Sequence, residues 1–504
     1  MMRKYIKAGL LAFALAACTD KDFDDVNRGL NQLDETKPVY LLNATLKKTY
    51  VSDAGFGNTV CGEWIHHVSR LNTLQYEYED FSASSTGLWD GVYLMNSDFG
   101  DVLRRTENTE DANEQSVRAL TLIGKALAFS RLTDVYGDVP YFTASTFVDG
   151  EVVEKTPYDS QEAIYKDLLA KLEEAVSLLE GKAVLDMTGA DRVYQGDLMK
   201  WKRFANSLRF RLAMRLSNVA PDLAADVISD VQGLDLIDSE ENSAIWENST
   251  DIGYENPMYG DLQSGNRAYT GGQLVNFLKD NEDPRLAVMA MTVRDTDEFN
   301  GFPNGAESVN DLDDYSYIGE QTYEKWVPTP VFLYSEMCFL KAEAYLRGIG
   351  MAKDETMANE WYRKGVESSL NYWSYQWIDR GRVPEAQPKY GEAEIEAFMA
   401  KDIATLSGTT EEKYRQIMEQ KWVSLFCNHF EAYAEGRRSG YPEIKQRQAV
   451  EDGLNYNLGE TNGVMPRRVK YPVKQGTFNP EYYQQAIDKT DGNSFLYRVW
   501  WDNK

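Results

Sequence analysis

The chain of 504 residues contains 53 Lys and Arg against 80 Asp and Glu, which gives a formal net charge of -27. Its length is sufficient for a large hydrophobic core, arranged as two or three domains or as one large body. The excess of negative charge excludes nucleic acid and an anionic bilayer surface as the main partner, because both would repel the protein.

The first residues are typical of a bacterial lipoprotein precursor. Three basic residues precede an apolar run over residues 8–17, which has the length of a secretory signal core and is too short to span a bilayer. The run ends in Leu15-Ala16-Ala17-Cys18, which resembles a lipobox. We therefore expect residues 1–17 to be a signal peptide and Cys18 to carry the acyl chains of a membrane anchor. The alternative is an ordinary cleaved signal with an incidental cysteine.

An acidic segment, residues 19–25, follows the lipobox. We expect residues 18–37 to form a flexible, solvated tether. The acidic run also resembles the surface-export signal of lipoproteins that some bacteria display outward. The tether would then hold a single body, residues 38–504, on the cell exterior.

Amphipathic helices dominate the first half of this body. Apolar residues recur at helical spacing over residues 38–51, 86–104, 114–136, 160–180, 198–216 and 221–231, whereas residues 61–85 lack this period and are predicted to form exposed loop. The segments 114–180 and 198–231 therefore predict two helical hairpins. Four arginines on the helix over 198–216 are interpreted as a solvated or salt-bridged face: Arg203, Arg209, Arg211 and Arg215.

The amino-acid composition changes from about residue 233 to residue 330, where glycine, asparagine and aspartate become frequent. Helical signals shrink to residues 273–279, and short strands are expected, for example around 285–293. Tyrosine and phenylalanine are frequent in this loop-rich insertion. Long loops held by a rigid scaffold usually carry the function of a protein.

The third hairpin covers residues 332–373, with a helix stop at Gly348 and Gly350 and a new start near Asp354. A final long helix is predicted over residues 411–433, opened by the capping box Thr409-x-x-Glu412. The region from about 436 to 504 has loop texture. A helical pair cannot bury its own apolar stripe, so the pairs must stack against one another.

Several motifs, taken in order, resemble the SusD/RagB family. After the lipobox they are the helix end Leu132-Thr133-Asp134-Val135-Tyr136-Gly137-Asp138-Val139-Pro140-Tyr141, then Lys341-Ala342-Glu343-Ala344, Gln420-Lys421-Trp422, Glu435-Gly436-Arg437-Arg438-Ser439-Gly440-Tyr441-Pro442 and Pro466-Arg467-Arg468-x-x-Tyr471-Pro472. The resemblance covers nearly the whole mature chain. It implies a mostly α-helical fold in which about four tetratricopeptide-like hairpins form a right-handed superhelical frame with a loop-rich insertion face.

The resemblance also implies a function. Members are lipid-anchored at the outer leaflet of the outer membrane and act as receptors over a SusC-like TonB-dependent transporter, and many of them bind oligosaccharides. They are not enzymes, and the family provides no catalytic residues. Ligand contacts vary between members, so no binding residue is carried over from the family.

Candidate ligand-binding residues therefore come from chemistry. Flat aromatic rings stack on the apolar faces of sugars, and neighbouring polar groups bind the hydroxyls. Two loop regions provide such rings, and for each ring the alternative is local packing. The candidates are Tyr76, Tyr78, Phe81, Tyr254, Tyr269, Phe302, Tyr315 and Tyr317. Trp89 is assigned to the core, whereas Trp373 and Trp377 are at the end of a hairpin, from which they would rim the same face.

Other chemistry finds little support in the sequence. The acidic run Asp311-Leu312-Asp313-Asp314 offers oxygen donors for calcium but lacks the D-x-D-x-D-G spacing, so a solvated loop is favoured and no metal or other cofactor is expected. The histidines His66, His67 and His429 have no metal-binding spacing. The cysteines Cys61, Cys338 and Cys427 form no C-x-x-C or zinc pattern, and Cys338 and Cys427 are expected to be buried free thiols because they lie in apolar helical contexts.

Three hypotheses follow. The first is a surface lipoprotein that captures an oligosaccharide and delivers it to an outer-membrane transporter. The second is the same architecture with a peptide ligand, for which the acidic body would favour basic peptides. The third is a surface glycoside hydrolase, although no particular pair of carboxylates stands out among 80 acidic residues.

Overall fold

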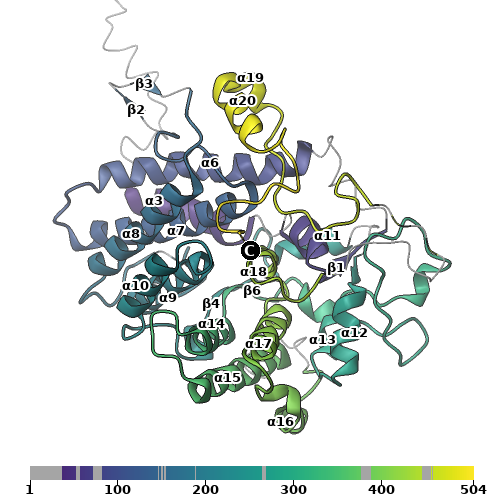
Figure 1. Cartoon of the computed structure of the whole chain (residues 1–504). Helices are drawn as coiled ribbons and strands as arrows, with labels where there is room; N and C mark the ends of the chain where they lie inside the picture. The colour runs from purple at the N-terminus through teal and green to yellow at the C-terminus, as the bar shows by residue number, and fades with distance from the viewer. Residues whose placement is uncertain are drawn as a thin grey trace, which may run out of the picture.

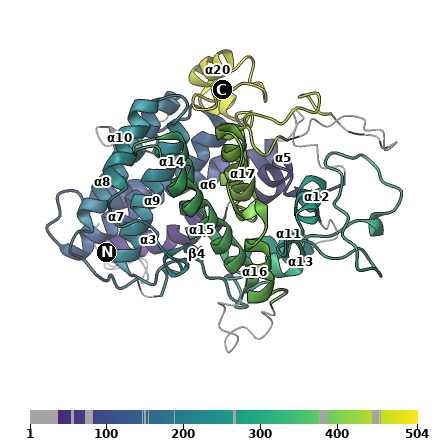
Figure 2. The same ribbon diagram turned by 60° about the horizontal axis from the view of Figure 1, so that its bottom comes forward.

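The computed structural model describes residues 37–52, 57–71, 82–145, 147–148, 151–152, 155–187, 189–263, 268–375, 388–444, 454, 456 and 458–503. The protein is mostly α-helical, as predicted. Figure 1 shows two halves: a layer of helices from the N-terminal and middle parts of the chain, and a looser half built from loops, short strands and short helices. The same division is visible after rotation in Figure 2.

The first half is a stack of consecutive helices that we call the helical frame. Neighbouring helices pack in pairs, α7 on α8, α9 on α10, α14 on α15 and α17 on α18, while α3 and α6 cover the first pair. The helices are α3 (Pro38–Lys47), α6 (Ser82–Arg105), α7 (Ala112–Tyr136), α8 (Gln161–Leu178), α9 (Leu198–Leu216), α10 (Pro221–Val231), α14 (Tyr334–Arg347), α15 (Glu355–Ser374), α17 (Thr410–Ser424) and α18 (His429–Ser439). These pairs match the three predicted hairpins and add a fourth.

Side-chain caps define where these helices start. Asp111, Asp197 and Asp354 each accept two backbone N–H groups at the first turn of α7, α9 and α15. The predicted capping box at Thr409 and Glu412 forms at α17. Such a cap stabilises a helix by about 1 kcal/mol, because it binds N–H groups that have no partner within the helix.

The helix predicted over residues 411–433 is in fact two helices. Chain direction changes at residues 425–428, between α17 and α18, where Cys427 has a φ of 65°. Asn428 then donates a side-chain hydrogen bond of 3.1 Å to the carbonyl of Val331. The prediction of one helix was wrong because apolar residues keep their helical spacing across the break, and no glycine or proline marks it. Because of the break, α17 and α18 are separate helices that pack on each other as the fourth pair.

The remaining elements of the body are short: α5 (Gly62–Trp64), β1 (Val68–Ser69), β4 (Ala244–Trp246), α11 (Pro257–Gln263), β5 (Tyr269–Thr270), α12 (Gly272–Asp280), α13 (Leu286–Met289), β6 (Thr329–Phe332) and α16 (Glu392–Met399). Of these, β4 and β6 pack in the core of the frame. Strand β1 pairs with β5 and β4 pairs with β6, both antiparallel. The expected strand around 285–293 is instead the helix α13, and the chain becomes extended only at Ala290, which bridges Ile318. A separate hairpin, β2 (Phe147–Val148) and β3 (Glu151–Val152), extends from the frame.

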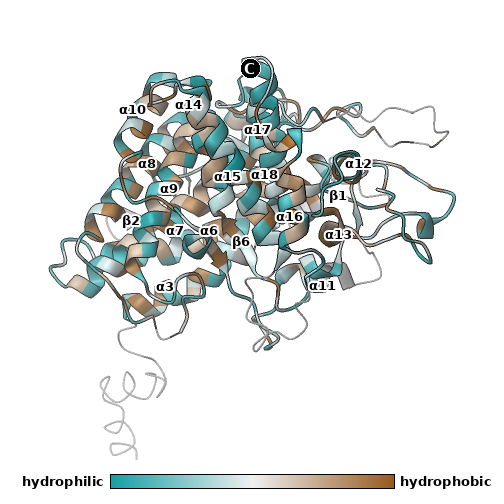
Figure 3. Ribbon diagram, turned by 90° about the horizontal axis from the view of Figure 1, so that it is seen from below, coloured by the Kyte–Doolittle hydropathy of each residue, from teal (hydrophilic) through white to brown (hydrophobic). Residues whose placement is uncertain are grey.

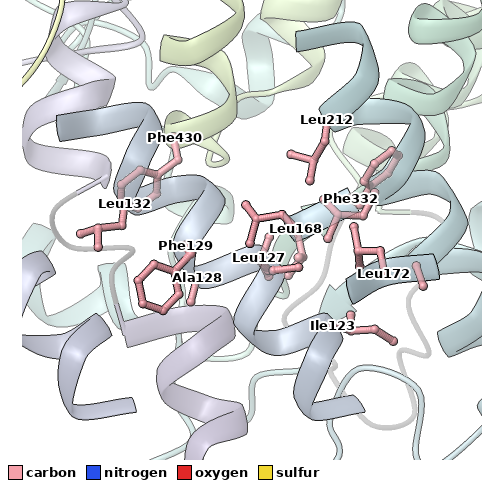
Figure 4. Packing of buried hydrophobic residues seen from close by; sticks show 14 of the residues in the cluster. Ile123, Leu127, Ala128, Phe129, Leu132, Leu168, Leu172, Leu212, Phe332 and Phe430 are labelled. Atoms are coloured by element: carbon pink, nitrogen blue, oxygen red, sulfur yellow. The ribbon is translucent and has the colours of Figure 1, made fainter. Parts of the chain in front are cut away.

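Two apolar cores hold the molecule together. The first lies among α3, α6–α10 and β6; Figure 4 shows Ile123, Leu127, Leu168 and Leu172 of α7 and α8 meeting Phe332. The second lies among α12–α18. Burying each of these side chains contributes about 1.5–3 kcal/mol. Figure 3 shows that the frame helices carry both hydrophobic and hydrophilic residues. Helix α18 is buried along its whole length, including its charged residues.

A network of buried ion pairs joins five frame helices. We call it the ion network; it has five carboxylates and five cations, namely Asp134, Arg211, Arg215, Glu336, Glu343, Arg347, Lys421, Glu431, Glu435 and Arg438. Arg215 is fully buried and donates to Glu431 at 2.7 Å and to Glu435 at 2.6 Å. Charges are tolerated inside a protein only when they are paired in this way.

The ion network explains several of the sequence motifs. The pKa of Glu435 is held well below its usual range by Arg438, Lys421 and Arg215, although burial acts in the opposite direction. The arginines of α9 are therefore salt-bridged, as one alternative predicted, but Arg211 and Arg215 are buried and do not face solvent. Arg203 and Arg209 bond to more exposed aspartates at the surface.

The C-terminal segment closes over the frame. The amide of Val469 bonds to the carbonyl of Val135 at 2.9 Å, and the buried guanidinium of Arg468 donates to the carbonyl of Tyr136 at 3.1 Å. The segment also forms α19 (Gln475–Phe478) and α20 (Pro480–Lys489), helices that its loop texture did not predict. Among the described residues, no helix has the length and apolarity needed to cross a bilayer.

Candidate functional site

Four short backbone segments meet at the edge of the second half of the molecule. In strands β1 and β5, Ser69 lies opposite Tyr269, and Tyr269 in turn bridges Tyr317. The amide of Phe302 bonds to the carbonyl of Thr270 at 2.9 Å, and the amide of Thr270 bonds to the carbonyl of Ser316 at 3.0 Å. Segments that lie up to 248 residues apart in sequence numbering, from Ser69 to Tyr317, thus form one small irregular sheet.

Four of the predicted rings are brought together on this sheet, and we call them the aromatic shelf: Tyr269, Phe302, Tyr315 and Tyr317. Tyr269 is stacked between two rings, with centroid distances of 4.6 Å to Phe302 and 4.6 Å to Tyr317. Tyr315 packs against Phe302 at 5.0 Å. Stacked aromatic pairs of this kind contribute about 0.5–1.5 kcal/mol each beyond the burial of their area.

The four rings of the shelf differ in burial: two lie beneath the surface and two lie at the surface. Phe302 and Tyr269 are buried, with 0% and 4% of their surface exposed, whereas Tyr315 and Tyr317 are half-buried. Side chains alternate along a strand, so Tyr315 and Tyr317 share one side while Ser316 points to the other and accepts a hydrogen bond from the amide of Asn300. The two outer tyrosines are thus held firmly at the surface by the two rings beneath them.

Glycines allow the segments to approach this closely. A Cβ atom at Gly271 would lie 2.1 Å from the carbonyl oxygen of His66, and one at Gly301 would lie 2.6 Å from the Cα of Gly272. Both distances are shorter than any van der Waals contact permits, so the sheet requires glycine at these positions. These glycines are a usable sequence signal for a close backbone approach, although not for the function of the residues beside them.

Two residues that contact the aromatic shelf were not predicted from the sequence. Leu71 and Tyr456 pack against the shelf, and Tyr456 also bridges Ala306. Tyr456 belongs to the C-terminal region, where no periodic pattern points toward residues 269–317. Only the tertiary structure brings it to the site.

The remaining predicted rings lie elsewhere. Tyr254 is 44% exposed and contacts Arg192 and Lys47 of the frame side, 4.6 Å and 5.8 Å from its ring centroid, so it is not part of the shelf. Trp373 is 1% exposed and belongs to the second core, which corrects the expectation that it rims the binding face. Trp89 is in the first core, as assigned. Tyr76, Tyr78, Phe81 and Trp377 lie outside the described residues, as does the anchor residue Cys18.

The loop beside the shelf, which we call the acidic rim, is strongly negative. Residues 294–314 contain seven acidic side chains and one basic one, Arg294, which pairs with Asp313. Asp311 accepts a hydrogen bond from the amide of Asp313, as expected for a structured loop. The negative charge would repel an anionic ligand and tolerate a neutral or cationic one.

The groups considered for metal or acid–base chemistry have other surroundings. Among the described ranges, no cluster of three or more His, Cys, Asp or Glu side chains is arranged to hold a metal ion. The rings of His67 and His429 are buried and pack against each other in a tilted arrangement, with centroids 5.3 Å apart. Asp134 and Glu336 have carboxyl groups whose pKa is raised by burial, and both belong to the ion network, away from the shelf.

Two comparisons place this architecture among known proteins. The profile of a family described as "SusD-like_2: Starch-binding associating with outer membrane" matches residues 30–472. A solved chitin-binding protein has a TM-score of 0.78 at 27% sequence identity, with 93% of this chain and 100% of that chain covered. No curated protein matches the chain.

Two further solved structures share the fold. A SusD homologue from Bacteroides vulgatus has a TM-score of 0.76 at 23% identity, covering 96% of this chain and 99% of that one. A chitin-binding SusD homologue from Flavobacterium johnsoniae has a TM-score of 0.70 at 23% identity, covering 93% and 98%. The described fold of this chain is therefore that of SusD homologues.

Proposed function

The chain belongs to the SusD-like family, and from this membership we propose that it captures a neutral or amino-sugar glycan on the aromatic shelf and delivers it to a SusC-like TonB-dependent transporter. The family is described as starch-binding and associated with the outer membrane. Capture, delivery and the transporter partner are the parts of the proposal that go beyond this description.

The observation that carries the proposal is the shelf itself. Tyr315 and Tyr317 are half-buried rings on a support of two buried rings, so they lose little conformational freedom when a ligand binds. Flat, rigid rings at a surface suit the apolar face of a sugar. The acidic rim favours glycans without carboxylate or sulfate groups.

The similarity to a chitin-binding protein at 27% identity makes chitin oligosaccharides the first ligands to test, followed by starch oligosaccharides. Calorimetry with the mature protein should detect binding of one of them. Tyr317→Ala should weaken that binding by about 1–3 kcal/mol, by analogy with bases stacked on aromatic side chains. Tyr254→Ala is the matched control, because this exposed tyrosine lies outside the shelf and its loss should leave the affinity unchanged.

The same experiment separates the alternatives. Unchanged affinity of Tyr317→Ala for a confirmed glycan would remove the shelf from the site. Binding of basic peptides, with no binding of glycans, would favour the peptide receptor that the acidic rim also permits. Release of new reducing ends from a polysaccharide, abolished by one carboxylate substitution, would show a hydrolase instead of a binding protein.

The membrane anchor is the other part of the proposal. Acylation of Cys18 would leave about twenty residues of tether before α3, which is enough for the body to move above the membrane while the site faces a transporter. Cys18→Ala should release the protein from the membrane fraction. Retention of this variant in the membrane fraction would exclude acylation of Cys18 as the tether.

A further inference from the structure

A small polar recess adjoins the shelf. It has a volume of about 20 Å³ and is lined by Ser69, Asn304, Glu63, Trp64, Met465 and Pro466, among others. This space is too small for a sugar ring, so only part of a substituent of a sugar can enter it.

The recess lies on the same side of the sheet as the rings. Ser69 is directly opposite Tyr269 in the β1–β5 pair, and side chains of directly opposed residues lie on one face, with Cβ atoms about 5 Å apart. Asn304 follows Phe302 by two residues and is fixed by the hydrogen bond of its Nδ2 to the carbonyl of Val68, at 2.9 Å. A sugar stacked on the shelf would therefore have one edge above the recess.

The polar groups of the recess include one donor and one acceptor that the protein does not use. Ser69 is 2% exposed, lines the recess, and its hydroxyl makes no hydrogen bond within the described part of the chain. Because Nδ2 of Asn304 is engaged by Val68, the orientation of its amide is set, and Oδ1 is left as an acceptor beside the recess. A ligand group in the recess can therefore hydrogen-bond to both atoms.

The other walls are apolar or already paired. Trp64, Met465 and Pro466 present carbon atoms, the carboxylate of Glu63 is paired with Arg70 at 3.1 Å, and Nδ1 of His66 lies 3.0 Å from Oε1 of Gln273. A ligand group that contacts all of these residues favourably needs an acceptor for Ser69, a donor for Asn304 and a methyl group for the apolar side chains. A hydroxyl lacks the methyl group, and a carboxylate lacks the donor and would be repelled by the acidic rim.

We propose that this recess binds the acetamido group of an N-acetylated amino sugar, with Ser69 donating to the acetyl oxygen, Asn304 accepting from the amide N–H, and the methyl group against Trp64 and Met465. The proposal rests on the proposed function, because the sugar ring is positioned by the shelf. It makes this protein selective for the substituent at one ring carbon and not only for a sugar face.

Three tetrasaccharides with the same β-1,4 linkage test the proposal by calorimetry: the N-acetylglucosamine tetramer, its deacetylated form, and the glucose tetramer. We expect the acetylated form to bind at least about tenfold more tightly than the glucose form, because a site with paired polar groups rejects a ligand that leaves them unpaired. Ser69→Ala should reduce affinity for the acetylated form by about three- to tenfold and leave the glucose form unchanged. Ser308→Ala, an exposed serine in the acidic rim outside the recess, should change neither.

Several outcomes would overturn the acetamido assignment. Equal binding of the acetylated and glucose tetramers, or an equal loss for both in a Ser69→Ala variant with unchanged thermal stability, would exclude recognition in the recess. Tightest binding of the deacetylated, cationic form would assign selectivity to the charge of the acidic rim. If a glycan without acetamido groups binds in a Tyr317-dependent manner and as tightly as the acetylated form, the proposed function stands and this inference fails; if no glycan binds at all, both fail.

Discussion

The two halves of this protein place their polar groups in opposite ways. In the helical frame, charged side chains are buried and paired with one another, as in Arg438 with Glu343 and Glu435 at 2.6 Å. On the face of the second half, the charged side chains of the acidic rim are exposed, and the buried positions are taken by rings such as Tyr269 and Phe302. The difference separates a region that must keep one geometry from a region that must offer a surface to a ligand.

The frame uses charge for specificity of packing. Every member of the ion network except Arg347 has an ionic partner on another helix, so a shifted helix would leave a buried charge without a partner. The face uses backbone hydrogen bonds and stacked rings to hold the chain in place. Breaking one interaction in each half should therefore have effects of very different size.

The largest effect is expected from Arg438→Met, which leaves Glu343 buried beside fewer cations. The free energy of unfolding should fall by about 3–5 kcal/mol, because removal of one partner of a buried ion pair leaves a charge uncompensated. Chemical denaturation measures this change. The glycan affinity of the folded fraction should stay the same, since Arg438 does not contact the shelf or the recess.

Lys353→Met is the control for Arg438→Met, because Lys353 is 53% exposed and its nearest acidic partner, Glu355, is 3.8 Å away. Its substitution should change stability by no more than about 0.5 kcal/mol. Equal stability of the two variants would mean that the ion network is not what holds the frame helices in place.

An intermediate effect is expected at the two histidines between the halves. Nε2 of His67 lies 3.0 Å from the carbonyl of Trp422 in α17, and His67 immediately precedes β1. Burial, followed by the charge of Arg70, lowers the pKa of His429 to about 3. Burial, followed by the charge of His429, also lowers the pKa of His67.

The sign of the pH dependence follows from these shifts. Below about pH 6.5 the unfolded chain binds protons at these histidines while the folded protein does not, so stability falls as the pH is lowered. For His429 the loss is about 2 kcal/mol between pH 7 and pH 5, a range above the titration of most carboxylates. Urea denaturation at pH 7, 6 and 5 measures it. His429→Gln keeps an acceptor for the amide of Cys427 and should lose about 2 kcal/mol less over this range; an unchanged slope would contradict the assignment.

Much of the frame was predictable from the sequence because its determinants are local. Helical periodicity and stop signals such as Gly348 predicted three hairpins, and the Thr409 capping box predicted the start of α17. The ion network was not predictable, because a buried arginine such as Arg215 looks the same in sequence as one on a solvated helix face. The break at Cys427 has no local signal, since a positive φ at a cysteine is imposed by its surroundings.

The face was predictable in composition but not in arrangement. Loop texture and aromatic residues indicated the right region, and four of the five candidates within residues 233–330 meet on the shelf, while Tyr254 does not. Tyr456 and the recess at Ser69 depend on contacts between segments far apart in the chain, which no local pattern encodes. Whether the shelf rings bind a ligand stays a prediction.

The smallest effect is expected from Arg294→Ala, which removes the exposed ion pair with Asp313 in the acidic rim. Backbone and side-chain hydrogen bonds hold the rim in place. The backbone N–H of Ser316 donates to the carbonyl of Asn300 at 2.7 Å, and the side-chain Nδ2 of Asn300 donates to the carbonyl of Asp314 at 2.8 Å. An exposed pair adds little to these, so stability should change by less than about 0.5 kcal/mol in the same denaturation assay. A loss as large as that of Arg438→Met would mean that the face, like the frame, depends on its ion pairs, and the contrast between the two halves would then be wrong.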